Sequence, residues 1–199
     1  MVLRVAEQAL ASRATRVVIA TDHADIAQAA RKGGIETLMT RVDHASGTDR
    51  LAEAIKQLGL TNETIVVNVQ GDEPLIDPQL INRVAQQLTQ DTQAAIATCA
   101  SPLADLAGLF NPNIVKVVCD QRDRALYFSR APIPWDRERF HTEPRTLASD
   151  HPALHHIGLY AYRVEFLQRF PMLSTGVLEG LEMLEQLRAL EHGLSLIHI

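Results

Sequence analysis

Polar residues of the kind that bind ions and substrates gather in three short segments of the chain, at residues 21–23, 44–50 and 70–74. The first follows a predicted strand, the second leads into a predicted helix, and the third ends the most apolar predicted strand. Ligands of open parallel sheets bind beyond the carboxyl ends of the strands. These three segments are therefore the candidates for a binding site at that edge of the sheet.

Asp72 is the most suggestive residue in these segments. It follows Gly71 at the end of the apolar run 64–70, and Glu73 comes next. Carboxylate oxygens are the ligands that Mg²⁺ prefers, and a protein-bound Mg²⁺ usually shares its site with substrate phosphates. The pattern fits a magnesium site, and it fits equally well an aspartate that only caps a turn.

Ser46 and Asp49 have the spacing of a capping box, in which a serine begins a helix and an acidic residue three positions later completes the cap. Capping alone explains the pair. The alternative is a nucleotide site, because the free amides at a helix start can hold an anion or the edge of a base.

Three further groups of residues have both a chemical and a structural interpretation. Arg130 could bind a carboxylate with two parallel hydrogen bonds, although the pattern alone favours a solvated side chain. The histidines at 141, 151, 155 and 156 lack the Cys-x-x-Cys spacing of a zinc site, and His156 differs from the rest because it opens a strand. Glu179, Glu182, Glu185 and Gln186 interrupt an apolar helix, either as a solvated stripe or as partly buried groups that need partners.

The elements that must position these residues alternate between strand and helix in the first hundred residues. Predicted strands cover 16–21, 35–39, 64–70 and 94–100, and predicted helices cover 25–31 and 46–57 and begin again at Asp77-Pro78. This rhythm indicates an α/β fold with an open, mostly parallel sheet. The strand 64–70 is apolar on both faces, which predicts a central parallel strand.

After residue 102 the rhythm changes. Residues 114–119 and 125–129 are predicted to form a hairpin, residues 136–153 a loop and residues 155–163 a strand. Leucines recur every three residues from 178 to 190, which predicts one mostly buried helix over 176–192.

Composition narrows the class of protein. The 199 residues carry 19 Lys and Arg against 24 Asp and Glu, a net charge of −5, and 46% are apolar, which is typical of one soluble domain. A pI of about 5.9 argues against a nucleic acid partner. No apolar run approaches the roughly 20 residues of a membrane helix, and the first residues lack the pattern of a signal peptide. With only two cysteines, we expect a cytoplasmic protein with reduced thiols.

Seven motifs, in one order along the chain, resemble a known family. They are Thr21-Asp-His23, Asp43-His-Ala-Ser-Gly-Thr48, Asn68-Val-Gln-Gly-Asp-Glu-Pro74, Phe110-Asn-Pro-Asn-x-Val-Lys-Val117, Ala125-Leu-Tyr-Phe-Ser-Arg-Ala-Pro-Ile-Pro-Trp135, His156-x-Gly-x-Tyr-x-Tyr162 and Leu178-Glu-x-x-Glu-Met-Leu-Glu-Gln-Leu-Arg188. The family is that of the 3-deoxy-manno-octulosonate (Kdo) cytidylyltransferases, also called CMP-Kdo synthetases. The resemblance implies one domain over residues 1–193, with a Rossmann-like open sheet of the nucleotide-diphospho-sugar transferase type and an inserted antiparallel hairpin.

The resemblance also implies a reaction and a set of site residues. The anomeric hydroxyl of Kdo would attack the α-phosphorus of CTP, releasing pyrophosphate and giving CMP-Kdo for lipopolysaccharide biosynthesis, with Mg²⁺ as cofactor and a homodimer as the assembly. By analogy Asp72 is the catalytic, metal-binding aspartate. The positions assigned to the nucleotide are Ser46, Gly47, Thr48 and Gln70, and those assigned to the sugar are Gln70, Arg130, His156, Tyr160, Glu185 and Gln186.

The sequence departs from the family at several points. The family's triphosphate-binding loop and its second metal-binding aspartate have no counterpart in the 199 residues, so we expect this chain to be inactive by itself. Residues 194–199 can be read as the translation of a transposon-end sequencing adapter, and we expect them to be a non-native tail. Gly176-Val177 stands where family members usually carry serine and proline.

Two other functions fit the same motifs. One is a cytidylyltransferase for another acidic sugar, such as a sialic acid or an amino-Kdo. The other is a non-catalytic remnant that binds a nucleotide or a sugar.

Overall fold

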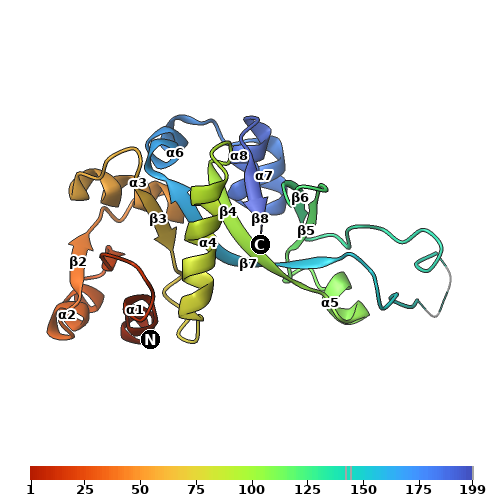
Figure 1. The fold of residues 1–199 in the computed structure, drawn as a ribbon, viewed down its shortest axis with the longest axis horizontal. Helices are drawn as coiled ribbons and strands as arrows, with labels where there is room; N and C mark the ends of the chain where they lie inside the picture. The colour runs from red at the N-terminus through yellow and green to blue at the C-terminus, as the bar shows by residue number, and fades with distance from the viewer. Residues whose placement is uncertain (142, 144, 199) are drawn as a thin grey trace.

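The strands of the computed structural model form two sheets, flanked by helices (Figure 1); the structure describes residues 1–141, 143 and 145–198. In the smaller sheet, β1 (Val18–Thr21) and β2 (Glu36–Met39) pair in parallel. The larger sheet has the order β6-β5-β7-β4-β8, with β3 also paired to β7. Its strands are β3 (Ile65–Asn68), β4 (Ile96–Pro102), β5 (Lys116–Cys119), β6 (Ala125–Ser129), β7 (Leu154–Arg163) and β8 (Leu196–His198).

The helices begin where the sequence places capping residues. Ser46 caps α3 and Asp77 caps α4, each accepting a hydrogen bond from a backbone N–H of the first turn, as predicted. The full set is α1 (Val2–Leu10), α2 (Ala24–Lys32), α3 (Gly47–Leu58), α4 (Pro78–Gln90), α5 (Leu106–Phe110), α6 (Val164–Arg169), the 3₁₀ helix η1 (Phe170–Met172), α7 (Val177–Glu182) and α8 (Gln186–Glu191). Among the described residues, no helix has the length and apolar character needed to cross a membrane.

The long strand β7 organises the larger sheet. β4 pairs along one edge of it, from Ile96 opposite Tyr162 to Pro102 opposite Leu154. β3 and β5 must therefore share the other edge, where β3 pairs with residues 160–163 and β5 with residues 154–155. Residues 156–159 of β7 lie between these two pairings. Sheets bind ligands where neighbouring strands diverge in this way, so the edge between β3 and β5 is the place to look for a site.

Strand directions confirm the predicted fold class and correct one of its details. β3, β4, β5 and β8 run in one direction, while β6 and β7 run in the opposite direction. The hairpin formed by β5 and β6 is antiparallel, as predicted. The prediction that 64–70 is a central parallel strand is wrong, because among the described residues β3 pairs only with β7, in antiparallel fashion. Its apolar faces indicated burial, but they carry no information about which strand lies beside it.

The predicted single helix over 176–192 is also wrong. It divides into α7 and α8 at Met183, whose φ of 53° and ψ of 49° are left-handed. Leucines at a period of three drift around a 3.6-residue helix, so one straight helix cannot bury them all. The division buries Leu184 and Leu187 and leaves Leu181 77% exposed. The sequence analysis also missed α5, α6, η1 and β8. Strand β8 lies within residues 194–199, and the non-native origin of those residues stays a prediction.

Apolar clusters cover both faces of the larger sheet. One contains Tyr160 and Tyr162 of β7 and packs against α3, α6 and α8. The other contains Leu159 and Ala161 of β7 and packs against α4. Successive residues of a strand point to opposite faces, which is why one strand contributes to both clusters.

Candidate functional site

His156 and Tyr160 form a buried neutral pair on β7, beside the point where β3 and β5 diverge. His156 Nε2 lies 2.8 Å from the Tyr160 hydroxyl, and both residues are less than 10% exposed. Burial lowers the pKa of His156 to about 3, assisted by the nearby His198 and His155. Burial also raises the pKa of Tyr160 well above its usual value. The pair can therefore exchange hydrogen bonds with a ligand without carrying charge, and His156 Nδ1 has no protein partner in the described part of the chain.

Because the pKa of His156 is low, we expect the free energy of unfolding to depend on pH. The unfolded chain protonates this imidazole below about pH 6.5 whereas the folded protein does not, so the free energy of unfolding decreases as pH falls from 6.5 toward 3, by at most about 1.4 kcal/mol per pH unit. We expect His156→Gln to flatten this decrease in urea unfolding measured at pH 6.5 and 4.5. His155→Gln is the matched control: it removes a smaller cause of the low pKa of His156 but leaves the burial that dominates, so most of the wild-type slope should remain. Equal slopes in all three proteins would contradict the assignment.

The start of α3 lies against Glu185, the residue that precedes α8. The Thr48 N–H is 3.5 Å from Glu185 Oε2, and a Cβ on Gly47 would lie 3.8 Å from Glu185 Oε1. The Thr48 side chain lies near Tyr162, which stacks on Tyr160 at 5.7 Å between ring centroids. The residues assigned to the nucleotide side and to the sugar side are thus brought together, although they lie more than a hundred positions apart.

Two more assigned residues, Ser46 and Gln186, lie at the starts of the helices that meet at this junction. The Ser46 hydroxyl accepts from the Asp49 N–H at 3.2 Å and donates to Asp49 Oδ2 at 2.9 Å, so the pair is a helix cap, as the sequence predicted. Gln186 is buried in the first turn of α8, next to Glu185.

Arg130 follows β6 and is held by groups that the sequence did not assign to the site. Its Nε donates to the Glu182 carbonyl at 2.7 Å, and its Nη1 donates to the Pro112 carbonyl at 3.0 Å. Its own carbonyl accepts from Lys116 Nζ at 2.6 Å. The interpretation of Arg130 as a freely solvated side chain is therefore wrong. The sequence carried two signals for this arrangement. Lys116 is a lysine within a predicted strand, and Glu182 is a glutamate within an apolar helix.

Hydrogen bonds join two of the three polar segments, whereas the third makes no side-chain hydrogen bond to them among the described residues. Arg50 Nη2 bonds Asp22 Oδ2 at 2.8 Å and its Nη1 bonds Thr40 Oγ1 at 2.7 Å, which joins segment 21–23 to segment 44–50. Gln70 and Asp72 are exposed, and the structure gives their side chains no hydrogen bond or ion pair among the described residues. The antiparallel register places Asn68 opposite Tyr160, so segment 70–74 begins close to the neutral pair.

Within the described ranges, no group of three or more side chains is arranged to hold a metal ion. A single exposed carboxylate such as Asp72 nevertheless fits Mg²⁺, because this ion keeps several waters and shares its site with phosphates. The magnesium role of Asp72 stays a prediction.

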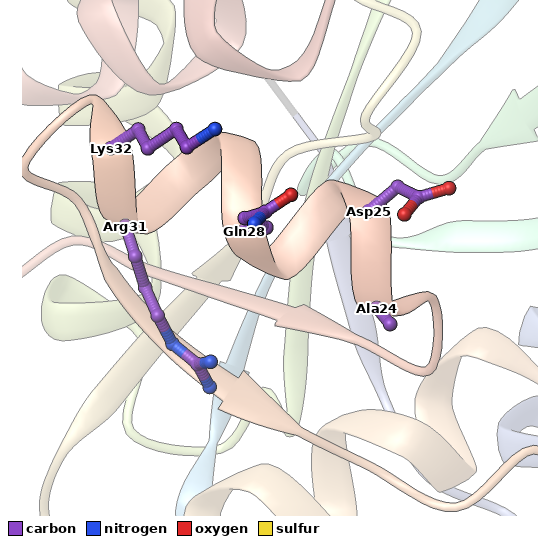
Figure 2. Close-up of a pocket in the computed structure, with 5 residues that line it drawn as sticks. All are labelled: Ala24, Asp25, Gln28, Arg31 and Lys32. Atoms are coloured by element: carbon purple, nitrogen blue, oxygen red, sulfur yellow. The ribbon is translucent and has the colours of Figure 1, made fainter.

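Two hollows of the surface differ in their distance from the polar segments. One, of about 600 Å³, is lined only by α2 (Figure 2), with Asp25 near one end of the helix and Arg31 and Lys32 near the other. The second, of about 1150 Å³, lies between α3 and residues 168–175, and its lining includes His44, Ala45 and Asp49 of segment 44–50. Neither hollow is lined by a residue that the resemblance assigned to the nucleotide, the sugar or the metal.

The carboxylate of Glu191 caps α7, the short helix that carries Glu182. It accepts from the N–H groups of Leu178 at 3.1 Å and Glu179 at 3.2 Å. A Cβ at Gly176 would overlap this carboxylate. The glycine therefore makes room for a cap supplied from α8.

This cap can be tested by a rescue experiment. We expect Glu191→Ala to destabilise the protein by about 1 kcal/mol, as is usual when a helix cap is lost. Adding Gly176→Ser should recover much of that loss, because the serine can cap the helix and the space is then vacant. Urea unfolding of the two proteins checks this, and a double variant less stable than Glu191→Ala would contradict it.

Comparisons with known proteins identify the family of the chain. A family described as cytidylyltransferase matches residues 1–196. A 3-deoxy-manno-octulosonate cytidylyltransferase from Herminiimonas arsenicoxydans is 51% identical over 200 residues, which cover 100% of this chain and 79% of the relative.

Solved structures are also similar. A CMP:2-keto-3-deoxy-manno-octonic acid synthetase complexed with CTP has a TM-score of 0.87 and 36% identity, covering 100% of this chain and 77% of that one. A cytidylyltransferase from Leptospira borgpetersenii serovar Hardjo-bovis (strain JB197) has a TM-score of 0.57 at 14% identity, covering 100% of this chain and 63% of that one, which shows a shared fold alone.

Proposed function

The chain belongs to the family of 3-deoxy-manno-octulosonate cytidylyltransferases, and on this premise we propose that it transfers CMP from CTP to the anomeric hydroxyl of Kdo, releasing pyrophosphate. The observation that carries the proposal is the junction at which Thr48 and Gly47 meet Glu185, with Tyr160 and His156 beside them. It places the start of α3, where a nucleotide can bind, next to neutral hydrogen-bonding groups suited to a sugar.

Each group has a distinct task in this proposal. The guanidinium of Arg130 binds the planar carboxylate of the sugar. His156 and Tyr160, both neutral, bind sugar hydroxyls, and Gln70 and Gln186 supply amide groups to the same substrate. Ser46 keeps the start of α3 in place, so that Gly47 and Thr48 can face the nucleotide. Asp72 would hold Mg²⁺, which when bound neutralises charge on the triphosphate.

The geometry also supports a second substrate class. The fork of Arg130 recognises a carboxylate whatever sugar carries it, so a sialic acid or an amino-Kdo is the alternative acceptor.

For assembly we propose a homodimer through the β5–β6 hairpin and the loop after it, where Leu126 is 61% exposed and Trp135 is 52% exposed. Sedimentation of the protein should then give twice the chain mass.

Binding and turnover together test the function. The chain covers 79% of its relative. We therefore compare two proteins, the 199-residue chain and a version extended with the remaining segments of the relative. We expect the 199-residue chain to bind Kdo in calorimetry, and the extended protein to release pyrophosphate from CTP with Kdo and Mg²⁺. Preference for a sialic acid would favour the alternative. Binding of neither acid, together with no turnover by the extended protein, would overturn the proposal.

A further inference from the structure

We propose that Glu182 is a positioning residue, which holds Arg130 in the orientation that binds the carboxylate of the acidic sugar. The inference rests on the proposed function, and it adds a residue to which neither the motifs nor the comparisons gave a role. It is carried by a set of hydrogen bonds that hold Arg130 at its backbone and its side chain.

Glu182 contacts Arg130 at two points. Its Oε2 accepts from the Arg130 backbone N–H at 2.9 Å, and its backbone carbonyl accepts from Arg130 Nε at 2.7 Å. Its Oε1 accepts from the Ser129 hydroxyl at 2.6 Å and from the Tyr127 hydroxyl at 3.3 Å. One glutamate thus ties the end of β6 and the guanidinium of Arg130 to α7, which lies beside the β5–β6 hairpin (Figure 1).

Lys116 completes the hold from the opposite side. This lysine is fully buried, and its Nζ donates to the carbonyls of Arg130 and Ile114 at 2.6 Å and of Asn111 at 2.9 Å. The backbone of Arg130 is therefore held between a carboxylate and an ammonium group.

Burial opposes the charge on Glu182, yet hydrogen bonds from Arg130, Ser129 and Tyr127 to its carboxylate lower the pKa of Glu182. The Glu182 side chain is therefore ionised at neutral pH.

The break between α7 and α8 is necessary for this contact. In a continuous helix the Glu182 carbonyl would accept from the N–H four residues later, that of Gln186. The left-handed conformation of Met183 ends α7 and leaves that carbonyl to Arg130 Nε. The departure from a single helix over 176–192 thus has a consequence at the site.

The contacts of Glu182 and Pro112 with Arg130 leave part of the guanidinium for a ligand. Of its five N–H groups, one on Nε and one on Nη1 are used by carbonyls, and the structure gives Nη2 no partner among the described residues. A side chain that is already ordered loses less rotamer entropy when a ligand binds. The fixed carbonyl contacts therefore leave the remaining N–H groups of an ordered Arg130 for the carboxylate of a substrate.

The test replaces Glu182 by glutamine and measures binding of three ligands by calorimetry: Kdo, its analogue without the carboxylate, and CTP. Glutamine has no charge and one acceptor oxygen in place of two, so Ser129 must turn from donor to acceptor, and the hydrogen bond from the Arg130 N–H is no longer charge-assisted. We expect affinity for Kdo to fall about tenfold or more, because a hydrogen bond to a charged group is disturbed. Affinity for the neutral analogue and for CTP should stay at the wild-type value. Glu165→Gln, on the exposed side of α6, is the matched control and should change none of the three.

The outcomes separate this inference from the function on which it rests. If the wild-type chain binds no acidic sugar, the proposed function fails and the inference fails with it. If the wild type binds Kdo and Glu182→Gln binds it equally well, only the inference is overturned. An equal loss for all three ligands would show a merely structural role and would also overturn it. Should Glu182→Gln not fold, Ser129→Ala, which removes one hydrogen bond to the carboxylate, must weaken Kdo binding selectively or the inference is wrong.

Discussion

Replacing Glu179 by glutamine is expected to destabilise the protein by about 3 kcal/mol or more, as is typical when one partner of a buried ion pair is removed. Glu179 and Arg188 form two parallel hydrogen bonds of 2.7 and 2.6 Å, and their side chains are only 10% and 8% exposed. The guanidinium also lies over the Phe170 ring, 4.3 Å from its centroid. Without the carboxylate, the charge of Arg188 would stay buried and would lose both of its hydrogen-bonded partner oxygens.

Urea unfolding followed by circular dichroism measures this loss. Glu36→Gln is the matched control, because Glu36 pairs with Arg16 at 2.6 Å in solvent, with side chains 43% and 49% exposed, and surface pairs contribute about 0–1 kcal/mol. Replacing both buried partners, as in Glu179→Leu with Arg188→Met, should cost much less than Glu179→Gln alone. A Glu179→Gln protein as stable as the Glu36→Gln control would refute the argument.

This ion pair also bears on the site, because it joins α7 to α8 across the break at Met183. Glu182 stands before the break, and Glu185 and Gln186 stand after it. We therefore infer that the pair fixes the relative position of the group that holds Arg130 and of the groups beside Tyr160.

Arg130→Lys is expected to lower affinity for Kdo by about 10- to 100-fold, the equivalent of one charge-assisted hydrogen bond. Lysine keeps the charge, but it lacks the planar fork that matches a carboxylate. It also cannot donate to the carbonyls of Glu182 and Pro112 in the geometry that Nε and Nη1 use. Affinity for CTP should not change, because none of the groups assigned to the nucleotide bonds Arg130.

Calorimetric titration with Kdo and with CTP checks this prediction. Arg137→Lys is the control, since Arg137 lies exposed in the loop that follows and should leave both affinities unchanged. An Arg130→Lys protein that binds Kdo as tightly as the wild type would remove Arg130 from the sugar site and would leave the proposed recognition of an acid without its cation.

Local chemistry made much of the fold predictable. The caps at Ser46 and Asp77, the hairpin of β5 and β6, and the strand β7 depend on residues close together in the chain, and the structure confirms each of them. The site residues were assigned by resemblance of their motifs, and their roles stay predictions. Their order along the chain indicated the family, and the similarity to solved relatives confirms it.

What the sequence by itself determined is therefore most of the longer helices and strands, the class of fold and the family. Only the tertiary structure decided that β7 rather than β3 is the strand around which the sheet forms, because periodicity shows which faces are buried and not which strand lies beside them. It likewise decided that the last helix breaks at Met183, where burial of Leu184 and Leu187 outweighs the intrinsic cost of a left-handed residue. The hold of Glu182 and Lys116 on Arg130 joins residues 14 to 52 positions apart. No local pattern encodes such distances, since they result from how the strands and helices pack.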